Sequence, residues 1–287
     1  MADESTLTSH NDVYLAAQIT ASILEEIRPR NVMRRLMDEK VAVGSNVYQW
    51  PIQDDPGAAT AKTEATDRVN TALTTSSAQA TLATVGQMAS PTDELGAASL
   101  VPVIPLVREV VGRSVLEKFE VDMCALLDDT TQTVATSGVD MTADTFLLAL
   151  ATLVSADIPG MYVFVGDPVS TTDLQRDIAA STSAIYGNPR WNPDMINGSD
   201  NGFQFTFAGV DVYQSSAVTT ANGGADQANG MFVPNHTFGL AVAPGWPIPR
   251  IELQRDASNN LTEVVATGRY GGVLKRNGDA VEVQTDA

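Results

Sequence analysis

The chain has 287 residues and a mass of 30.4 kDa, a length that fits one large domain or two interleaved ones. Hydrophobic residues make up 44% of the sequence and charged residues 18%, which is enough apolar material for a core and argues against disorder. The 35 acidic residues outnumber the 17 basic ones, so the net charge is −18. A surface of this sign repels phosphate, which argues against sequence-independent nucleic-acid binding and against docking on an anionic membrane.

Residues suited to catalysis are few and scattered. The single cysteine, Cys124, excludes an intrachain disulfide and a multi-cysteine metal cluster, and its apolar helical setting predicts a buried, inert thiol. The two histidines, His10 and His236, are too isolated for the metal-binding motifs that need paired histidines. The glycine motifs of dinucleotide, phosphate-loop and serine-hydrolase sites are all missing. We therefore expect no enzyme, no metal site and no cofactor.

The sequence also lacks membrane and secretion signals. It contains no run of about 18 apolar residues, so we expect no transmembrane helix. The first residues, Met1–His10, lack the basic and apolar regions of a signal peptide. We expect the protein to be made and kept in the cytoplasm, or assembled there.

The N-terminal residues resemble an arm. Residues 11–27 carry apolar side chains at helical spacing, and Pro29 ends the pattern. A short apolar and basic segment follows at 32–37. Such an arm needs another surface to bury its stripe, so we name Ile19 and Ile23 as candidate contacts with another subunit.

A long β-hairpin is predicted next. Residues 41–50 are rich in strand formers, Gln53–Gly57 is a turn cluster, and residues 68–75 return as a threonine-rich strand. An isolated hairpin buries too little to be stable, so it must lie on a neighbouring subunit or, alternatively, on its own core. If the neighbour is the partner, loss of Trp50 should weaken subunit contacts more than folding. The candidate contact residues are Tyr48, Trp50, Ile52, Val69 and Leu73.

A strand at residues 79–88 leads to a short helix, for which Ser90 is the expected N-cap. A long helix is then predicted over residues 103–127, about 37 Å at 1.5 Å per residue. One apolar stripe runs along it at steps of four. The residues of this spine-helix stripe are Val107, Val111, Val115, Phe119 and Met123.

Residues 131–250 alternate helices and strands. Thr142 and Ser170 each begin a helix, a buried strand lies at 161–165, and a hairpin spans 203–213. The Asn-Gly pairs of this region, including the pair at Asn229, predict exposed loops. The segment 187–193 reads as an irregular loop, in which Trp191 is another candidate contact with a neighbouring subunit.

The C-terminal residues are β again. A hairpin is expected within 251–265, and a second one within 273–283 with a type I′ turn at Asn277–Gly278.

This order of elements resembles the Hong Kong 97-type fold of the major capsid proteins of tailed phages and related viruses. Residues 80–95 resemble the family's strand and short helix, and residues 106–127 its spine helix. Residues 144–168 resemble the first helix and strand of the family's axial domain, and residues 269–283 its closing strands. The order carries the likeness, since each motif is weak alone.

The resemblance implies an α+β fold with four parts. Residues 1–40 would be an N-terminal arm and residues 41–78 an extended loop built on a β-hairpin. Residues 79–130 with 251–287 would form a peripheral domain that holds the spine helix, and residues 131–250 an axial domain.

The resemblance also implies a function. Identical copies would assemble, in the host cytoplasm, into hexamers and pentamers that form an icosahedral shell. The shell would enclose double-stranded DNA without sequence-specific binding. The expected partners are other copies of the chain and a portal protein, with a separate scaffolding protein and a decoration protein left open. Because the chain enters the arm directly at Met1, we expect no fused scaffold segment.

Three alternatives stay open on sequence alone. The same fold builds encapsulin compartments, which enclose a cargo enzyme instead of a genome. A soluble enzyme could use Asp128 or Asp129, although no histidine or third ligand is spaced to help them. A fibre or tail-tube protein fits less well, because those folds are mainly β and lack a spine helix.

Overall fold

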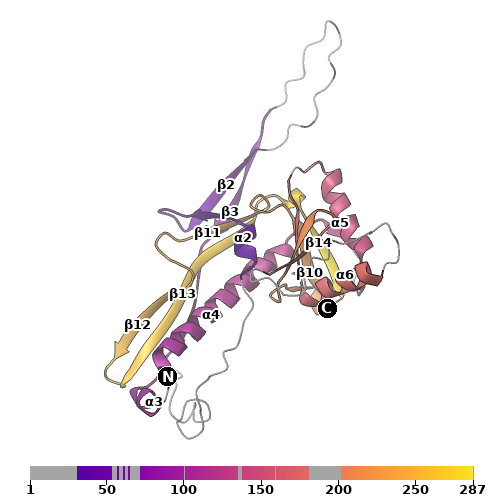
Figure 1. The fold of residues 1–287 in the computed structure, drawn as a ribbon. Helices are drawn as coiled ribbons and strands as arrows, with labels where there is room; N and C mark the ends of the chain where they lie inside the picture. Colours follow the sequence, from indigo (N-terminus) through magenta and orange to yellow (C-terminus); the bar gives the residue numbers. More distant parts are fainter. Residues whose placement is uncertain are drawn as a thin grey trace.

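The computed structural model shows an α+β protein built on two β-sheets and a long helix (Figure 1). The predicted helix at 11–27, with Ile19 and Ile23, lies outside the described residues, as do Val69 and Trp191. The structure describes residues 31–53, 57, 61, 64, 72–99, 101–134, 138–158, 160–180 and 202–286.

The first sheet has five strands in the order β1-β11-β13-β12, with β4 paired to the long strand β13. Strand β13 is its centre, because β4 pairs along one edge while β12 and β11 pair along the other. The strands are β1 (Asp38–Val41), β4 (Ala83–Ala89), β11 (Phe238–Val242), β12 (Arg250–Asp256) and β13 (Leu261–Leu274).

The second sheet has seven strands in the order β5-β14-β10-β6-β8-β7, with β9 paired to β10. Strands β6 and β8 are parallel, and β10 and β14 are antiparallel. The strands are β5 (Thr133–Val134), β6 (Val163–Gly166), β7 (Phe203–Phe207), β8 (Val210–Gln214), β9 (Thr220–Ala221), β10 (Asp226–Phe232) and β14 (Ala280–Asp286).

A separate two-stranded hairpin extends from the body (Figure 1). It consists of β2 (Val47–Gln53) and β3 (Thr75–Thr81). The second strand therefore begins seven residues later than the expected 68–75, and the described residues 72–74 are not in a strand. The expected strand at 79–88 is divided at Leu82, where the chain leaves β3 and enters β4 of the first sheet.

The long helix α4 (Val103–Cys124) lies against the first sheet, and a 3-10 turn (Ala125–Leu127) follows it. Its 22 residues span about 33 Å. Four residues of the predicted stripe are buried, and Val107 is half-buried against the same core. That core also contains Val165 of β6 and Phe232 of β10, so it is continuous between the two sheets. The buried stripe residues are Val111, Val115, Phe119 and Met123.

Two helices cover the second sheet, α5 (Ala143–Ser155) and α6 (Pro168–Ala180). Thr142 caps α5 as predicted, since its hydroxyl accepts a hydrogen bond from the Thr145 N–H at 3.2 Å. Helix α6 begins two residues before the expected start at Ser170. The carboxylate of Asp167 instead accepts from the Val169 N–H at 2.8 Å, which leaves Ser170 inside the helix and buried.

The short helix α3 (Asp93–Ala98) also starts later than expected. Its N-cap is Thr92, whose hydroxyl accepts from the Leu95 N–H, and not Ser90. None of the described helices has the length and apolar character needed to cross a bilayer.

The C-terminal strands do not form the expected second hairpin. β13 pairs within the first sheet and β14 within the second, and a 3-10 turn (Asn277–Asp279) replaces the predicted type I′ turn. Strand β11 likewise lies in the first sheet although its residues fall within 131–250. Sheet membership therefore crosses the expected domain boundaries, because the chain passes between the sheets three times, after β4, after β10 and after β13.

Asn229 does not mark an exposed loop. It lies in β10 with 0% exposure, and its amide donates to the hydroxyls of Ser170 and Thr285 at 3.1 and 2.8 Å. Its Oδ1 accepts from the Asp167 N–H at 2.8 Å. These bonds attach the start of α6 to the sheet, and a buried amide with its hydrogen bonds satisfied costs little.

The end of the N-terminal arm is buried within its own chain. Helix α2 (Met33–Leu36) puts both of its apolar residues into the main core, so this segment does not need a partner to cover it. Glu120 of α4, which is 3% exposed, holds the start of α2. Its Oε1 accepts from the N–H groups of Val32 and Met33 at 3.0 and 3.2 Å, and from the Ser215 hydroxyl at 3.2 Å.

We expect Glu120 to make stability depend on pH. Burial raises its pKa, and the hydrogen bonds from Met33 and Val32 only partly oppose this effect. The stabilising contribution of protonated Glu120 is therefore complete below its ordinary pKa of 4.5 and is lost as pH rises through the raised value. In Glu120→Gln nothing ionises, so the melting temperature of this variant relative to the parent should rise between about pH 4 and 8. A difference that stays constant over that range would contradict the prediction.

Candidate assembly surfaces

The hairpin of β2 and β3 is the first candidate surface, and it projects well beyond the two sheets (Figure 1). Its strands pair in antiparallel register from Val47–Thr81 to Gln53–Thr75. The paired residues carry no charged side chain, although the chain as a whole has a net charge of −18. Most of them are exposed. An uncharged, exposed ribbon can approach another copy of an acidic chain with little electrostatic repulsion.

The base of this hairpin is packed on its own chain. Trp50 is only 7% exposed and lies in a small core with Ala80, Leu82 and Ala241. Tyr48 contacts the Trp50 ring edge-on, with 4.6 Å between ring centroids. Removing this side chain would open a cavity within the subunit, so Trp50 also contributes to folding, while its contact with a neighbour stays a prediction. Ile52, nearer the outer end of β2, is half-buried, and Leu73 is 68% exposed.

Two glycines of the first sheet let the hairpin come this close. A Cβ on Gly239 would lie 2.8 Å from Cζ2 of Trp50. A Cβ on Gly271 would meet the backbone oxygen of Thr81 and lie 2.8 Å from its carbonyl carbon. Both distances are shorter than any ordinary carbon contact, so larger residues would push the hairpin off the sheet. Sequence reasoning missed these glycines, because only the crossing of the hairpin over the sheet reveals their role.

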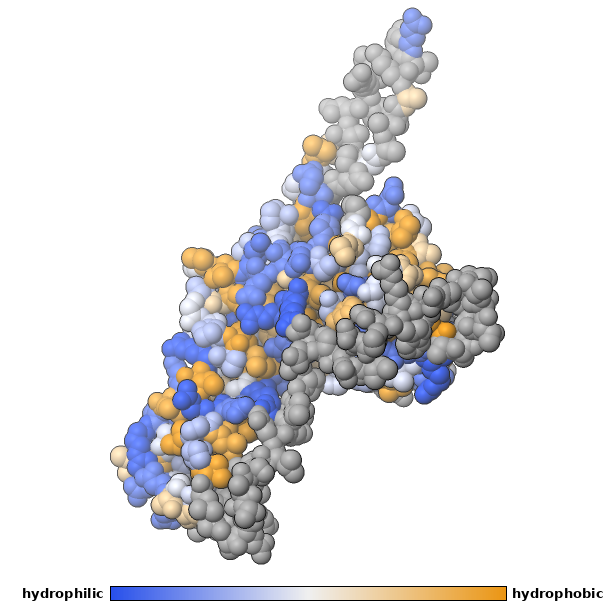
Figure 2. All heavy atoms as spheres, in the orientation of Figure 1, coloured by the Kyte–Doolittle hydropathy of each residue, from blue (hydrophilic) through white to orange (hydrophobic). Residues whose placement is uncertain are grey.

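The outer face of α5 is the second candidate surface. Leu148 is 58% exposed and Val154 is 56% exposed, and Met161, which follows the helix, is 71% exposed. Figure 2 shows hydrophobic side chains over the region in which Figure 1 places α5. Asp144 is the one charged residue of α5. Large apolar side chains gathered on an exposed surface are typical of an interaction site, so this face is a candidate contact with another molecule.

The described residues offer little for catalysis. Burial and the adjacent Glu120 charge raise the pKa of the buried Cys124 thiol, which disfavours the reactive thiolate. Asp128 and Asp129 are both exposed. The described part of the chain contains no group of three histidine, cysteine or acidic residues that could hold a metal ion.

Comparison with known proteins identifies the fold. No family model matches the sequence, and no curated protein matches it. Solved structures do match. The capsid of Ralstonia phage GP4 aligns at a TM-score of 0.71 and 12% identity, covering 99% of this chain and 98% of that one. The capsid of a native gene transfer agent particle aligns at 0.70 and 13%, covering 100% of both chains. The chain has the Hong Kong 97-type capsid fold.

A third match agrees with this assignment. The capsid structure of cyanophage P-SCSP1u aligns at a TM-score of 0.68 and 15% identity, covering 96% of this chain and 94% of that one. The low identities show why the resemblance to the Hong Kong 97-type fold rests on the order of the elements and not on shared motifs.

We expect Gly271→Ala to loosen the hairpin base of this capsid fold. The added methyl group must displace the Thr81 backbone, which should cost about 1–3 kcal/mol in the free energy of unfolding. Urea unfolding of the purified subunit would measure it. Gly96→Ala in α3 is the matched control, since nothing lies within 4 Å of its added Cβ and a helical alanine gains up to about 1 kcal/mol. Equal stability of the two variants would refute the role of Gly271.

Proposed function

We propose that this chain is the major capsid protein of a tailed phage or a related virus. Copies of it assemble into hexamers and pentamers that form an icosahedral shell around packaged double-stranded DNA. The observation that carries the proposal is the match to capsid structures over nearly the whole chain, with the projecting hairpin included. The role is structural and not enzymatic.

The parts of the subunit then take distinct roles. Residues 1–40 form the arm and residues 41–78 the extended loop, which overlaps a neighbouring subunit. The first sheet with α4 forms the peripheral domain, and the second sheet with α5 and α6 forms the axial domain. This proposed division follows sheet membership, so it assigns β11, which pairs in the first sheet, to the peripheral domain and β14, which pairs in the second, to the axial domain.

Apolar burial drives the association. Surfaces such as the outer face of α5 are exposed in the single subunit, and their removal from water yields about 25 cal/mol per Å². Head-to-tail contacts between different faces of neighbouring copies close into rings. The axial domains meet at the centre of such a ring, and the apolar face of α5 lies in that contact.

The acidic charge fits a container for DNA. With a net charge of −18 per copy, the wall does not hold DNA tightly, so a packaging motor can fill the shell. A strongly basic inner face would overturn this explanation. The other partners are a portal protein and, where present, separate scaffolding and decoration proteins, with assembly in the host cytoplasm.

Electron microscopy of the purified full-length protein tests the proposal. Closed particles of one or a few sizes, with nuclease-protected DNA in particles taken from infected cells, would support it. A monomer at high concentration would overturn it. Particles that contain a cargo enzyme and no DNA would also overturn it and indicate an encapsulin-type compartment.

We expect the outer part of the hairpin to be needed for assembly and not for folding. Gln53 and Thr75 face each other across the strands, so an Asn-Gly turn can join them in place of residues 54–74. This variant should keep the melting temperature of the parent, because Trp50 and its core remain. It should remain as free subunits or capsomers in electron micrographs. Normal shells from it would contradict the role of the extended loop.

We expect a charge on α5 to block assembly. Leu148→Glu adds an acid to an apolar face, which an interface between acidic copies must then bury. Shell yield should fall at least tenfold by sedimentation, with an unchanged melting temperature because the position is exposed. Leu148→Ala is the matched control, and it should lose far less yield since it removes area without adding charge. Equal yields from the two variants would show that α5 is not at an interface.

A further inference from the structure

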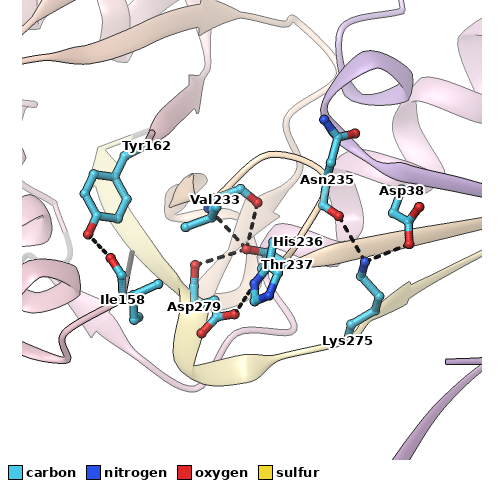
Figure 3. Close-up of polar contacts among 9 residues, drawn as sticks. All are labelled: Asp38, Ile158, Tyr162, Val233, Asn235, His236, Thr237, Lys275 and Asp279. Atoms are coloured by element: carbon cyan, nitrogen blue, oxygen red, sulfur yellow. Dashed lines mark hydrogen bonds and ion pairs between the residues drawn. The ribbon is translucent and has the colours of Figure 1, made fainter. Parts of the chain in front are cut away.

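The base of the hairpin is tied to the place where the chain crosses between the two sheets. The indole N–H of Trp50 donates to Oδ2 of Asp38 at 3.0 Å. The ammonium group of Lys275 donates to the same oxygen at 3.0 Å, and to the carbonyl oxygen of Asn235 at 3.2 Å (Figure 3). One carboxylate oxygen thus joins β2, β1 and the segment that follows β13.

Two of the three passages between the sheets, β10 to β11 and β13 to β14, meet at this point. Asn235 lies in the turn from β10 to β11, and Lys275 lies in the passage from β13 to β14. Figure 3 shows the two passages side by side, bonded to each other. The Thr237 carbonyl accepts from the Lys275 N–H at 2.8 Å, and the Thr237 hydroxyl donates to the Asp279 carbonyl at 3.1 Å. His236 contacts the carboxylate of Asp279 at 2.7 Å.

The two lysines that pair with Asp38 differ in their exposure to water. The side chain of Lys275 is only 9% exposed, so water competes little for its ion pair with Asp38. Lys40 also reaches Asp38, at 3.1 Å to Oδ1, but it is 48% exposed. Burial by itself would raise the pKa of Asp38, and the hydrogen bonds from Lys275, Lys40 and Trp50 outweigh that effect and lower it. The carboxylate is therefore charged at neutral pH. Because Lys40 is exposed, its ion pair with Asp38 contributes little to stability.

We propose that Asp38, Trp50 and Lys275 form a lock that sets the direction in which the hairpin leaves the body. Trp50 rests on Gly239, so packing fixes its height above the sheet, while the hydrogen bond to Asp38 fixes its rotation. Lys275 then fixes Asp38 relative to the junction of the two sheets. The lock positions the extended loop through contacts within its own chain.

This inference rests on the proposed function for its consequence in the shell. Three residues of β2 follow Trp50 and span about 10 Å when extended, so a rotation of about 10° at the lock moves the outer end of the strand by about 2 Å. Such a displacement would misplace the loop on the neighbouring subunit. Loss of the lock should therefore alter the geometry of particles more than the stability of subunits.

Spin-label distances in the unassembled full-length subunit test the lock. Labels at Gln53→Cys and Val110→Cys report on the hairpin and on α4, and Cys124 is buried and stays unlabelled. Lys275→Met keeps the aliphatic stem and removes the charge, and it should broaden the distance distribution at least twofold. Lys40→Met, the matched control, should leave the distribution unchanged. An unbroadened distribution in Lys275→Met would overturn the proposal.

Two further measurements complete the test. Trp50→Phe keeps a ring over Gly239 but removes the N–H donor, so it should also broaden the distribution, and it replaces Lys275→Met if that variant does not fold. Electron microscopy should show irregular or open particles from either lock variant and normal shells from Lys40→Met. Normal shells despite broadened distances would overturn the link to shell geometry. If the parent forms no shells, the proposed function fails, while the distances still decide whether the lock exists.

Discussion

The hairpin of β2 and β3 cannot bury its own apolar side chains, and much of the structure follows from that constraint. Two strands alone bury too little apolar surface to be stable in water. The base of the ribbon is held by Trp50 in a small core of the body, where Gly239 and Gly271 allow close contact. Farther out, the described residues Gln53 and Thr75 are exposed. A ribbon that is firmly held at one end and exposed at the other is suited to reach another subunit.

The charge distribution also favours the hairpin as a contact between subunits. Copies that each carry a net charge of −18 repel one another, so contacts form most readily where acidic side chains are missing. The hairpin strands have no charged residue, and α5 has only Asp144 near its start. Inside the subunit, two acidic side chains each accept several hydrogen bonds. Glu120 accepts from backbone N–H groups, and Asp38 accepts from Lys275 and Trp50.

Local patterns predicted much of the architecture. The stripe of α4 could be predicted because apolar residues at steps of four share one face of a helix. The Thr142 cap could be predicted because its hydrogen bond joins residues that are close in sequence. Caps were misplaced where two candidates stood close together, as with Ser90 and Thr92. Of the candidate contact residues, Tyr48, Trp50, Ile52 and Leu73 lie in the described part of the chain, and their contacts with a neighbour stay a prediction.

By itself the sequence determined the order of helices and strands, the long α4, the uncharged hairpin and the acidic surface, since each depends on residues that are neighbours along the chain. Only the tertiary structure decided which strands pair. It separated β13 from β14, placed β11 in the first sheet, and buried Asn229 and Trp50. The physical reason is that these interactions join residues far apart in sequence: the strand pairs, the contacts of Gly239 and Gly271, and the hydrogen bonds of Asp38 with Trp50 and Lys275. A pattern of neighbouring residues cannot predict which distant residues meet.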